Sequence, residues 1–332
     1  MGAIRKNPVS EGVLRKVQLT GGATLIVSLP KEWVKKVNLK PGDYVVIVPQ
    51  PDNSLKISLA KEGRVNLETV LKITPRMSPT IALREFVARY LLGYNTIKVV
   101  LADGTRKQRE IIRDYMARSL IGVEVVEEAK NLMVVQCLAG YSELPLKTAL
   151  RRMSNTTFYM ISDVISNVRE PNIESLDDIV KRDDDVDKFY LYIVRQMNLV
   201  ALGLILPHEV GLSNVRESVE YVMISKSIER IADHVVRIAE SLKKLMSENV
   251  RLDDKIRDAI YEYGNYALEL YLSAIKALFK RDSITAHDVI DRSWEMRVME
   301  DNILRYILYS GGDVMRKALS LRIILESFKL SL

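Results

Sequence analysis

The sequence predicts a multidomain α+β protein of 332 residues, with a small β module, a small α/β module and a long helical half. Three observations predict this fold class. Residues 12–60 alternate between apolar and polar side chains, and residues 69–140 switch between strand and helix periodicity. From about residue 143 onward the pattern is helical and repeats itself. Apolar residues make up 48% of the chain, which is ample for hydrophobic cores.

Residues 12–60 are expected to form the small β module. Tight turns are predicted at Gly21-Gly22 and Asp52-Asn53, and Pro30 precedes a short helix. The expected elements are strands at 13–20, 23–30, 44–51 and 54–60 and a helix at 31–39. So few residues bury a poor core by themselves, and pairing with a second copy would solve that problem.

Residues 69–140 are expected to form a small α/β sandwich with helices packed on a sheet. Ser78 is placed to cap the first helix and Gly93 to end it. Cys137 is the only cysteine and lies in an apolar strand, so we expect a buried thiol and no internal disulfide. The expected elements are strands at 70–74, 96–102, 123–129 and 131–139 and helices at 78–93 and 105–120.

The helical half contains a tandem repeat. Residues 177–196 align with residues 287–306 at an offset of 110, and residues 221–234 align with the stretch after residue 320 at an offset of 100. The repeat predicts two three-helix bundles. The expected helices are 143–169, 173–202, 214–248, 253–281, 284–309 and 313–332, with breaks at Pro171, Pro207-His208 and Gly311-Gly312.

Two acidic pairs in the first bundle are the candidate site. Asp183 and Asp187 lie in one predicted helix, and Glu229 and Asp233 lie in the next. Residues four apart share a helix face, so two facing helices could build an all-oxygen cation site. The alternative is that these acids form a solvated surface, as runs of charge usually do.

The second bundle has lost these acids. Asp183 corresponds to Ser293, Asp187 to Arg297 and Glu229 to Lys329, while the apolar frame is retained. The fold itself therefore does not require acids at these positions. This comparison favours a function for the acids of the first bundle.

The net charge of +6 lies wholly in residues 1–64, which hold eleven Lys and Arg and five Asp and Glu. Such an asymmetry favours an anionic partner, most often nucleic acid. Arg15 and Lys16, expected on the first strand, and Lys31, Lys35 and Lys36, on the short helix, would form a phosphate-contacting face. The alternative is a small domain that is basic without binding DNA.

Several other function classes find no support in the sequence. Gly21-Gly22 matches neither a Walker loop nor a dinucleotide fingerprint, and the three histidines make no zinc motif. No Ser–His–Asp or Cys–His order is present. We expect no transmembrane helix and no signal peptide, and a reducing cytoplasm as the compartment.

Stretches of the helical half and of the N-terminal module resemble known protein families. SIERIADHVVRIAES, residues 227–241, resembles the signature helix of PhoU-family phosphate-signalling regulators, and RDDDVDKFY, residues 182–190, resembles their partner helix. RKVQLTGGATLIVSLPKEWVKKVNLKPGDYVVIV, residues 15–48, is similar to the SpoVT/AbrB swapped-hairpin DNA-binding domain. The order of the modules resembles archaeal phosphate-uptake regulators.

The resemblance implies a domain plan. It gives an AbrB-like DNA-binding and dimerisation domain at 1–64, a small α/β domain at 65–142, a first PhoU-like bundle at 143–249 and a degenerate, shortened second bundle at 250–332. It also implies metal ligands at Asp183, Asp187, Glu229 and Asp233, for Fe, Zn, Mn or Mg, with at most one cluster. DNA contacts would come from Arg15, Lys16, Lys31, Lys35 and Lys36.

The function expected from these features is a homodimeric, non-enzymatic regulator of phosphate uptake that binds DNA and metal, with phosphate as a candidate further ligand. Its partners would be DNA, a second copy and a phosphate transporter or signalling protein. One alternative is a dimeric adaptor that docks on a transporter or kinase without binding DNA. Another is a metal-dependent hydrolase, which needs an open coordination position and a general base that the sequence does not nominate.

Overall fold

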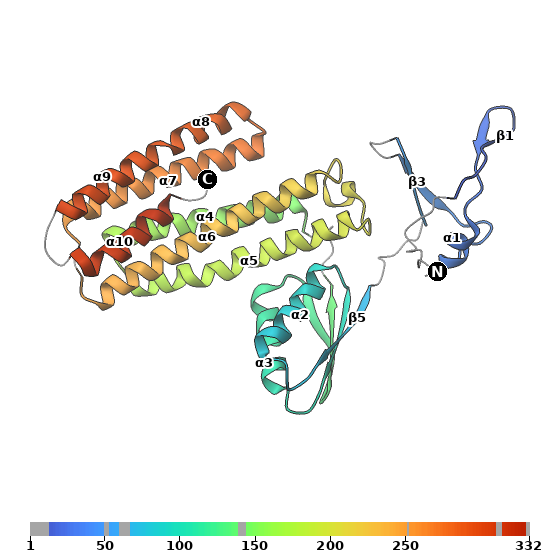
Figure 1. Cartoon of the computed structure of the whole chain (residues 1–332), viewed down its shortest axis with the longest axis horizontal. Coiled ribbons are helices and arrows are strands. Elements are labelled where there is room, and N and C mark those ends of the chain that lie inside the picture. The colour runs from blue at the N-terminus through green and yellow to red at the C-terminus, as the bar shows by residue number, and fades with distance from the viewer. Residues whose placement is uncertain are drawn as a thin grey trace, which may run out of the picture. The chain divides into compact units, whose positions relative to one another are not determined.

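The computed structural model divides the chain into two compact units, Met1–Val65 and Asn66–Leu332 (Figure 1). The residues it describes are 13–49, 53–59, 67–138, 144–250, 252–309 and 314–329. The chain is a multidomain α+β protein, as the sequence predicts. None of the helices in these ranges is long and apolar enough to cross a membrane.

The described residues of the first unit form two hairpins separated by a short helix. Its elements are β1 (Gln18–Thr20), β2 (Thr24–Ile26), α1 (Lys31–Lys36), β3 (Val45–Pro49) and β4 (Leu55–Leu59). Both hairpins are antiparallel. The turn between β1 and β2 has φ angles of 58° at Gly21 and 83° at Gly22, which glycine adopts without strain.

The strands of the first hairpin are shorter than predicted, and this corrects the placement of Arg15 and Lys16. Both residues precede β1, whose three residues pair only with Thr24–Ile26. An isolated two-stranded hairpin is marginal, and among the described residues of one chain no strand continues the ladder before Gln18.

No described side chain of the first unit is buried. The exposed apolar side chains of its strands and loops include Leu14, Leu19, Leu25, Ile26, Tyr44 and Ile47. Exposed apolar surface on this scale normally marks an interaction surface. Within a single chain, residues 13–49 and 53–59 therefore form no hydrophobic core of their own.

The second unit begins with a four-stranded sheet in the order β5-β6-β8-β7. Strands β5 and β6 are parallel, and β8 is antiparallel to both β6 and β7. The helices α2 and α3 pack side by side on the sheet (Figure 1), as the predicted sandwich requires. The elements are β5 (Glu68–Ile73), α2 (Pro79–Leu91), β6 (Thr96–Leu101), α3 (Arg106–Ser119), β7 (Val123–Ala129) and β8 (Leu132–Cys137).

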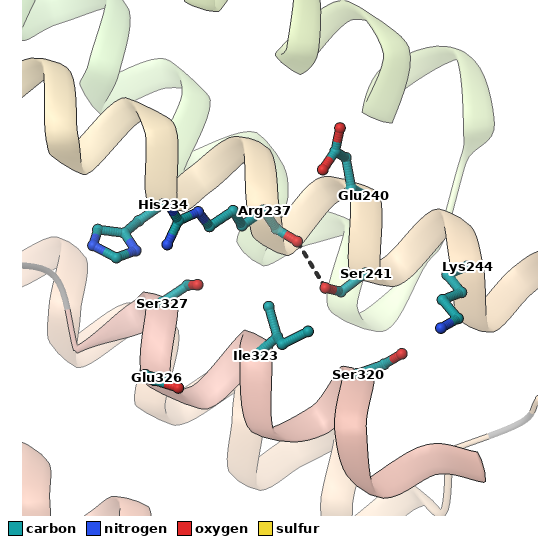
Figure 2. Close-up of a pocket in the computed structure, with 9 residues that line it drawn as sticks. All are labelled: His234, Arg237, Glu240, Ser241, Lys244, Ser320, Ile323, Glu326 and Ser327. Carbon is teal, nitrogen blue, oxygen red and sulfur yellow. Dashed lines mark hydrogen bonds between the residues drawn. The ribbon is translucent and has the colours of Figure 1, made fainter.

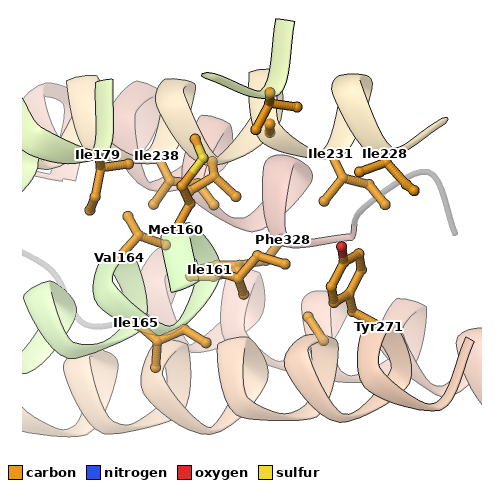
Figure 3. Packing of buried hydrophobic residues seen from close by; sticks show 14 of the residues in the cluster. Met160, Ile161, Val164, Ile165, Ile179, Ile228, Ile231, Ile238, Tyr271 and Phe328 are labelled. Atoms are coloured by element: carbon orange, nitrogen blue, oxygen red, sulfur yellow. The ribbon is translucent and has the colours of Figure 1, made fainter. Parts of the chain in front are cut away.

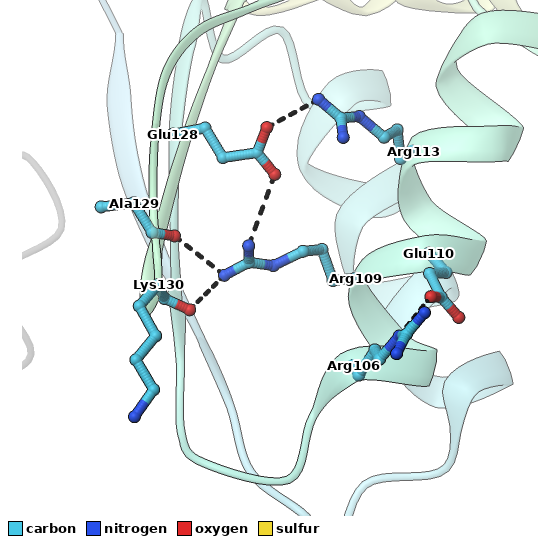
Figure 4. Close-up of polar contacts among 7 residues, drawn as sticks. All are labelled: Arg106, Arg109, Glu110, Arg113, Glu128, Ala129 and Lys130. Atoms are coloured by element: carbon cyan, nitrogen blue, oxygen red, sulfur yellow. Dashed lines mark hydrogen bonds and ion pairs between the residues drawn. The ribbon is translucent and has the colours of Figure 1, made fainter.

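Two arginines tie α3 to the turn between β7 and β8 (Figure 4). Arg109 donates from Nη2 to the carbonyl oxygens of Ala129, at 2.9 Å, and of Lys130. Arg113 Nη2 lies 2.6 Å from Oε2 of Glu128, and Arg109 Nη1 donates to Oε1 of the same carboxylate at 3.4 Å. The predicted thiol of Cys137 is buried at the end of β8, and burial raises its pKa.

The sequence signals at both ends of α2 are confirmed. Ser78 Oγ accepts a hydrogen bond of 3.2 Å from the amide of Ile81, and Gly93 has a φ of 92° just after the helix. A Cβ added at Gly93 would lie 2.5 Å from Cδ2 of Leu199, so the Leu199 side chain would have to shift to admit any other residue. This close approach fixes the end of α2 against the next domain.

Two polar side chains of α5 complete that contact. Arg195 is buried and donates to the carbonyl oxygens of Tyr90 and Gly93, the second at 3.1 Å. Asn198 Nδ2 donates to the carbonyl of Leu91 at 2.8 Å. Carbonyl groups at a helix C-terminus lack partners within the helix, and these two side chains supply them.

In the rest of the second unit, the described residues form seven α-helices. They are α4 (Leu146–Arg169), α5 (Ile173–Ala201), α6 (Glu217–Ser247), α7 (Asp254–Lys280), α8 (Ser283–Ser293), α9 (Glu295–Tyr309) and α10 (Val314–Phe328), with a 3-10 turn at Pro207–Val210. One hydrophobic cluster includes side chains from all seven helices, and Figure 3 shows part of it. The predicted domain boundaries within the helical half stay predictions, because this core is continuous across them.

The predicted helix at 284–309 is divided in two at Trp294. The amide of Trp294 bonds the carbonyl of Asp291 at 3.2 Å, and the amide of Arg297 bonds the carbonyl of Trp294 at 3.2 Å. Both bonds span three residues, so the helix tightens locally. Neither Pro nor Gly marks this position, which explains why the sequence pattern does not predict the break.

Candidate metal centre

The two acidic pairs lie on α5 and α6, which pack against each other along their lengths. On α5, Asp183 and Asp187 flank the buried Val186, and both are half-buried. On α6, Glu229 is buried with 8% of its surface exposed, and Asp233 is half-buried. The candidate residues are therefore at the edge of the helix interface and not on a fully solvated face.

The electrostatics show that the four acids share one neighbourhood. Burial raises the pKa of Asp183 to about 7, with further increases from Asp187, Asp233 and Glu229. The pKa of Asp187 is raised to about 6. The largest cause is burial, and the next is electrostatic repulsion from Glu229 and Asp233. Because the acids of α6 act on both acids of α5, the cluster repels itself when ionised.

One oxygen in this cluster lacks a partner. Asp183 Oδ1 is buried and accepts no hydrogen bond within the described residues. Buried carboxylate oxygens are normally paired or coordinate a cation. The donor set, four carboxylates with an unpartnered oxygen, has the chemistry that a hard divalent or trivalent cation requires.

Glu229 already has a cationic partner. Lys226 Nζ lies 2.5 Å from both carboxylate oxygens of Glu229 and 5.2 Å from the centre of the Tyr190 ring. In the described ranges, no group of three or more His, Cys, Asp or Glu side chains stands close enough to hold a metal ion. The four carboxylates are close enough to repel one another electrostatically, but their side chains do not converge on a single point.

The sequence did not predict that the α/β module borders the acid cluster. Arg118 of α3 lies 4.0 Å from a carboxylate oxygen of Asp184. The pKa of Tyr115, on the same helix, is raised by burial first and then by Asp187 and Asp184. Of these neighbours of the acid cluster, only Lys226 could have been predicted from the sequence. It lies three residues before Glu229 and therefore on the same helix face.

His234 is directed to a different side of α6. It lines a pocket of about 440 Å³ between α6 and α10, opposite Ser327 and near Arg237 and Glu326 (Figure 2). Its Nδ1 is buried without a hydrogen-bond partner among the described atoms. Its pKa is lowered by burial and then by Arg237.

The second-repeat counterparts of the acids make ordinary structural contacts. Ser293 donates to the carbonyl of Ile290 at 2.7 Å, and Lys329 pairs with Glu300 at 3.1 Å. The guanidinium of Arg297 lies 4.2 Å from the centre of the Trp294 ring. These positions are part of the second bundle's own packing and surface.

The basic candidates of the first unit are all exposed. Lys31, Lys35 and Lys36 lie on α1, as predicted, and Arg15 and Lys16 lie in the extended segment before β1. Arg15 makes a 3.4 Å hydrogen bond to the carbonyl of Leu14. Exposed cations of this kind are free to contact phosphate oxygens.

The fold and the acid cluster together define a protein with an N-terminal β module and, later in the chain, a helical bundle that contains a carboxylate-rich helix pair. The family model for the PhoU domain matches residues 150–242, which include all four acids. The model for "Antidote-toxin recognition MazE, bacterial antitoxin" matches residues 18–64. The chain therefore carries a PhoU domain and, at its N-terminus, a MazE/AbrB-like domain.

A curated relative agrees with the first of these domains. The chain is 27% identical over 156 residues to a protein of Clostridium acetobutylicum named "Phosphate-specific transport system accessory protein PhoU homolog". That alignment covers 44% of this chain and 68% of the relative. No solved structure matches the chain significantly.

Proposed function

We propose that this protein regulates phosphate uptake, with a cation site in its first helical bundle and a DNA-binding, dimerising N-terminal module. The observation that carries the proposal is the group of four carboxylates on α5 and α6, two of which have raised pKa values. This group lies within the stretch that matches the PhoU domain. The name of the Clostridium acetobutylicum relative supports the link to phosphate transport.

In this proposal Asp183, Asp187, Glu229 and Asp233 hold an ion of Fe, Zn, Mn or Mg. A bound cation would neutralise the repulsion among the carboxylates and would make the site attractive to phosphate. Lys226 would then be released from Glu229 and could pair with an anion. We assign no catalytic residue, and the regulator acts through a phosphate transporter or signalling protein.

We predict that the double variant Glu229→Ala/Asp233→Ala loses the bound metal. Removing two of four carboxylates halves the negative charge that attracts the cation and removes half of its ligands. The measurement is elemental analysis of the purified full-length protein after incubation with Fe, Zn, Mn or Mg and removal of free metal. The wild type is expected to retain metal and the variant almost none.

A matched control variant removes the same amount of negative charge but leaves the four acids of the cluster in place. Asp185 and Glu240 are exposed acids on the same two helices, and the double variant Asp185→Asn/Glu240→Gln is expected to retain wild-type metal content. Equal metal content in the wild type and in Glu229→Ala/Asp233→Ala would remove the site.

The DNA-binding half of the proposal is supported by the first unit. It has exposed lysines on α1 and no buried side chain among its described residues, so a second copy is the natural source of a core. A dimer would also present two copies of the basic surface. Both features are expected of the MazE/AbrB-like domain found at residues 18–64.

We predict that the full-length protein retards duplex DNA in a gel-shift titration and that added salt weakens the binding. Replacing Lys31, Lys35 and Lys36 with glutamine should weaken it further. If each lysine contacts one phosphate, the slope of log K against log salt should fall in magnitude by about 2.7 per copy.

The control replaces three exposed lysines of α7, Lys255, Lys276 and Lys280, with glutamine and so matches the change in net charge. It is expected to leave DNA binding unchanged. A protein that dimerises but retards no DNA at low salt would instead be the adaptor, with the N-terminal module acting only in dimerisation.

A further inference from the structure

A large apolar groove opens in the helical half, away from the acid cluster. It has a volume of about 1210 Å³ and is walled by the first half of α6, the second half of α7 and α8, with the start of α4 below. Small-molecule pockets are typically about 300–1,000 Å³, so this groove exceeds the usual size. Its floor includes the buried side chains Ile228, Ile231 and Tyr271 (Figure 3).

The groove lies in line with the surface of α6 on which α10 packs. Helix α10 packs against α6 and runs antiparallel to it, since Ser320 faces Lys244 and Ser327 faces His234 (Figure 2). Phe328 is the last residue of α10, and its ring packs at 6.3 Å from that of Tyr263. Beyond this ring, along the direction of α10, lie the residues that line the groove.

The walls of the groove have helical periodicity. On α6 the lining runs from Glu217 to Ile231 at intervals of three and four residues, which is the pattern of one helix face. At 1.5 Å per residue this face is about 21 Å long, or about four helical turns. Exposed apolar side chains border the groove on both sides, with Met223 66% and Ile290 56% exposed.

Charge is confined to the end of the groove that lies farthest from α10. There Arg281 Nη2 lies 3.9 Å from a carboxylate oxygen of Glu217. The other charged lining residues are Lys147, Arg216, Glu220 and Asp282. The end nearest Phe328 is apolar, with Ile231, Ile275 and Ile290 among its lining residues. An occupant should therefore be apolar beside α10 and polar at the other end.

The internal repeat indicates what kind of segment fits there. At the offset of 100, α10 corresponds to the first half of α6, and Ile228 and Phe328 are buried at equivalent positions. In the first bundle, α6 continues past Ile228 to Ser247, and this second half buries an apolar face. The buried apolar residues of that second half are Ile231, Ala232, Val235, Ile238, Ala239, Leu242 and Leu245.

We propose that the groove binds an amphipathic helix of a partner protein, about four turns long, in line with α10 and antiparallel to α6. The partner helix would carry apolar residues at intervals of three and four, as the second half of α6 does. It would bury Met223 and Ile290 and extend the interface that α10 already forms. The groove is separate from the acid cluster, so this interaction does not depend on bound metal.

The test uses a labelled peptide with the sequence of residues 230–247, held helical by a lactam bridge between its Glu240 and Lys244. Fluorescence anisotropy is measured while full-length protein is added. We expect saturable binding, weakened at least tenfold by Met223→Asp and by Ile290→Asp. Because both side chains are more than half exposed, these variants should retain the wild-type circular dichroism spectrum and melting temperature.

Two controls make the result specific. Val219→Asp changes another exposed apolar residue of α6, outside the groove, and should leave peptide affinity unchanged. A peptide with aspartate in place of Ile231 and Ile238 should not bind.

Three results would overturn the proposal. The first is no saturable binding up to about 1 mM peptide, the weakest affinity of interest here. The second is binding that both groove variants leave unchanged. The third is a wild-type oligomer, seen by light scattering, that Met223→Asp and Ile290→Asp dissociate, because a second copy would then occupy the groove.

Discussion

Replacing Arg195 with methionine is expected to lower the free energy of unfolding of the second unit by about 3 kcal/mol. Arg195 is 4% exposed, and its guanidinium donates to the carbonyls of Tyr90 and Gly93 at the end of α2. It also lies 4.9 Å from the centre of the Tyr90 ring. Methionine fills a similar volume but donates no hydrogen bond. The carbonyl of Gly93 would therefore lose this donor, and the carbonyl of Tyr90 would keep only its hydrogen bond from the Gly93 amide, at 3.0 Å.

Two opposing effects decide the size of this change. No carboxylate of the described residues lies within 4.0 Å of Arg195, so its buried charge is stabilised by carbonyls and by the negative end of α2. Removing a buried charge recovers its desolvation cost, whereas each unsatisfied carbonyl costs about 1–3 kcal/mol. We expect the second effect to be larger, because the carbonyls stay buried against α5.

Urea unfolding followed by far-ultraviolet circular dichroism measures the effect of Arg195→Met, since the helices of the second unit dominate that signal. Amide exchange at the end of α2 should also become faster. The exposed Arg230 of α6 provides a control, and Arg230→Met should change stability by less than about 0.5 kcal/mol. Unchanged or increased stability of Arg195→Met would mean that the desolvation of the guanidinium is the larger effect.

Replacing Asp183 with asparagine is expected to stabilise the metal-free protein at pH 8. The pKa of Asp183 is raised from 3.8 to about 7 by burial and by the neighbouring acids. The folded protein therefore keeps a proton that the unfolded chain loses, and the unfolding free energy falls as pH rises from about 4 to about 7. Asparagine cannot ionise and removes this penalty.

The expected gain for Asp183→Asn at pH 8 is about 1–2 kcal/mol, allowing for solvent screening of a half-buried side chain. At pH 4, where the carboxyl is protonated in the folded state, we expect almost no gain. Urea unfolding in the presence of a chelator measures both values. Asp185→Asn, an exposed position paired with Lys188 at 3.1 Å, should show little change at either pH. A gain of equal size at both pH values would contradict the proposed repulsion.

The sequence predicted those elements whose signals are local. The strands and helices of the α/β module, the Ser78 cap and the Gly93 terminus follow from periodicity and capping chemistry, which act over a few residues. The helix spans of the bundles were predicted for the same reason, except that the predicted helix at 284–309 is divided in two at Trp294. The prediction failed where pairing decides structure: Arg15 and Lys16 lie outside β1, because a strand needs a neighbour to extend it.

The candidate site was predicted in its residues but not in its surroundings. Spacing of four placed each acid pair on one helix face, and the structure brings both pairs into one electrostatic field. The ion pair of Lys226 with Glu229 and the nearby Tyr115 and Arg118 of α3 were not predicted. Metal binding by this cluster stays a prediction that the elemental analysis tests.

The sequence by itself determined the order of the modules, the repeat in the helical half and the composition of the acid cluster, because periodicity, capping and spacing act locally. Tertiary structure alone decided that the buried Arg195 joins α5 to the end of α2, and that side chains of α6, α7 and α8 line one groove. Both features depend on side chains that are far apart in the sequence. Their burial and hydrogen bonding are fixed only when the helices pack.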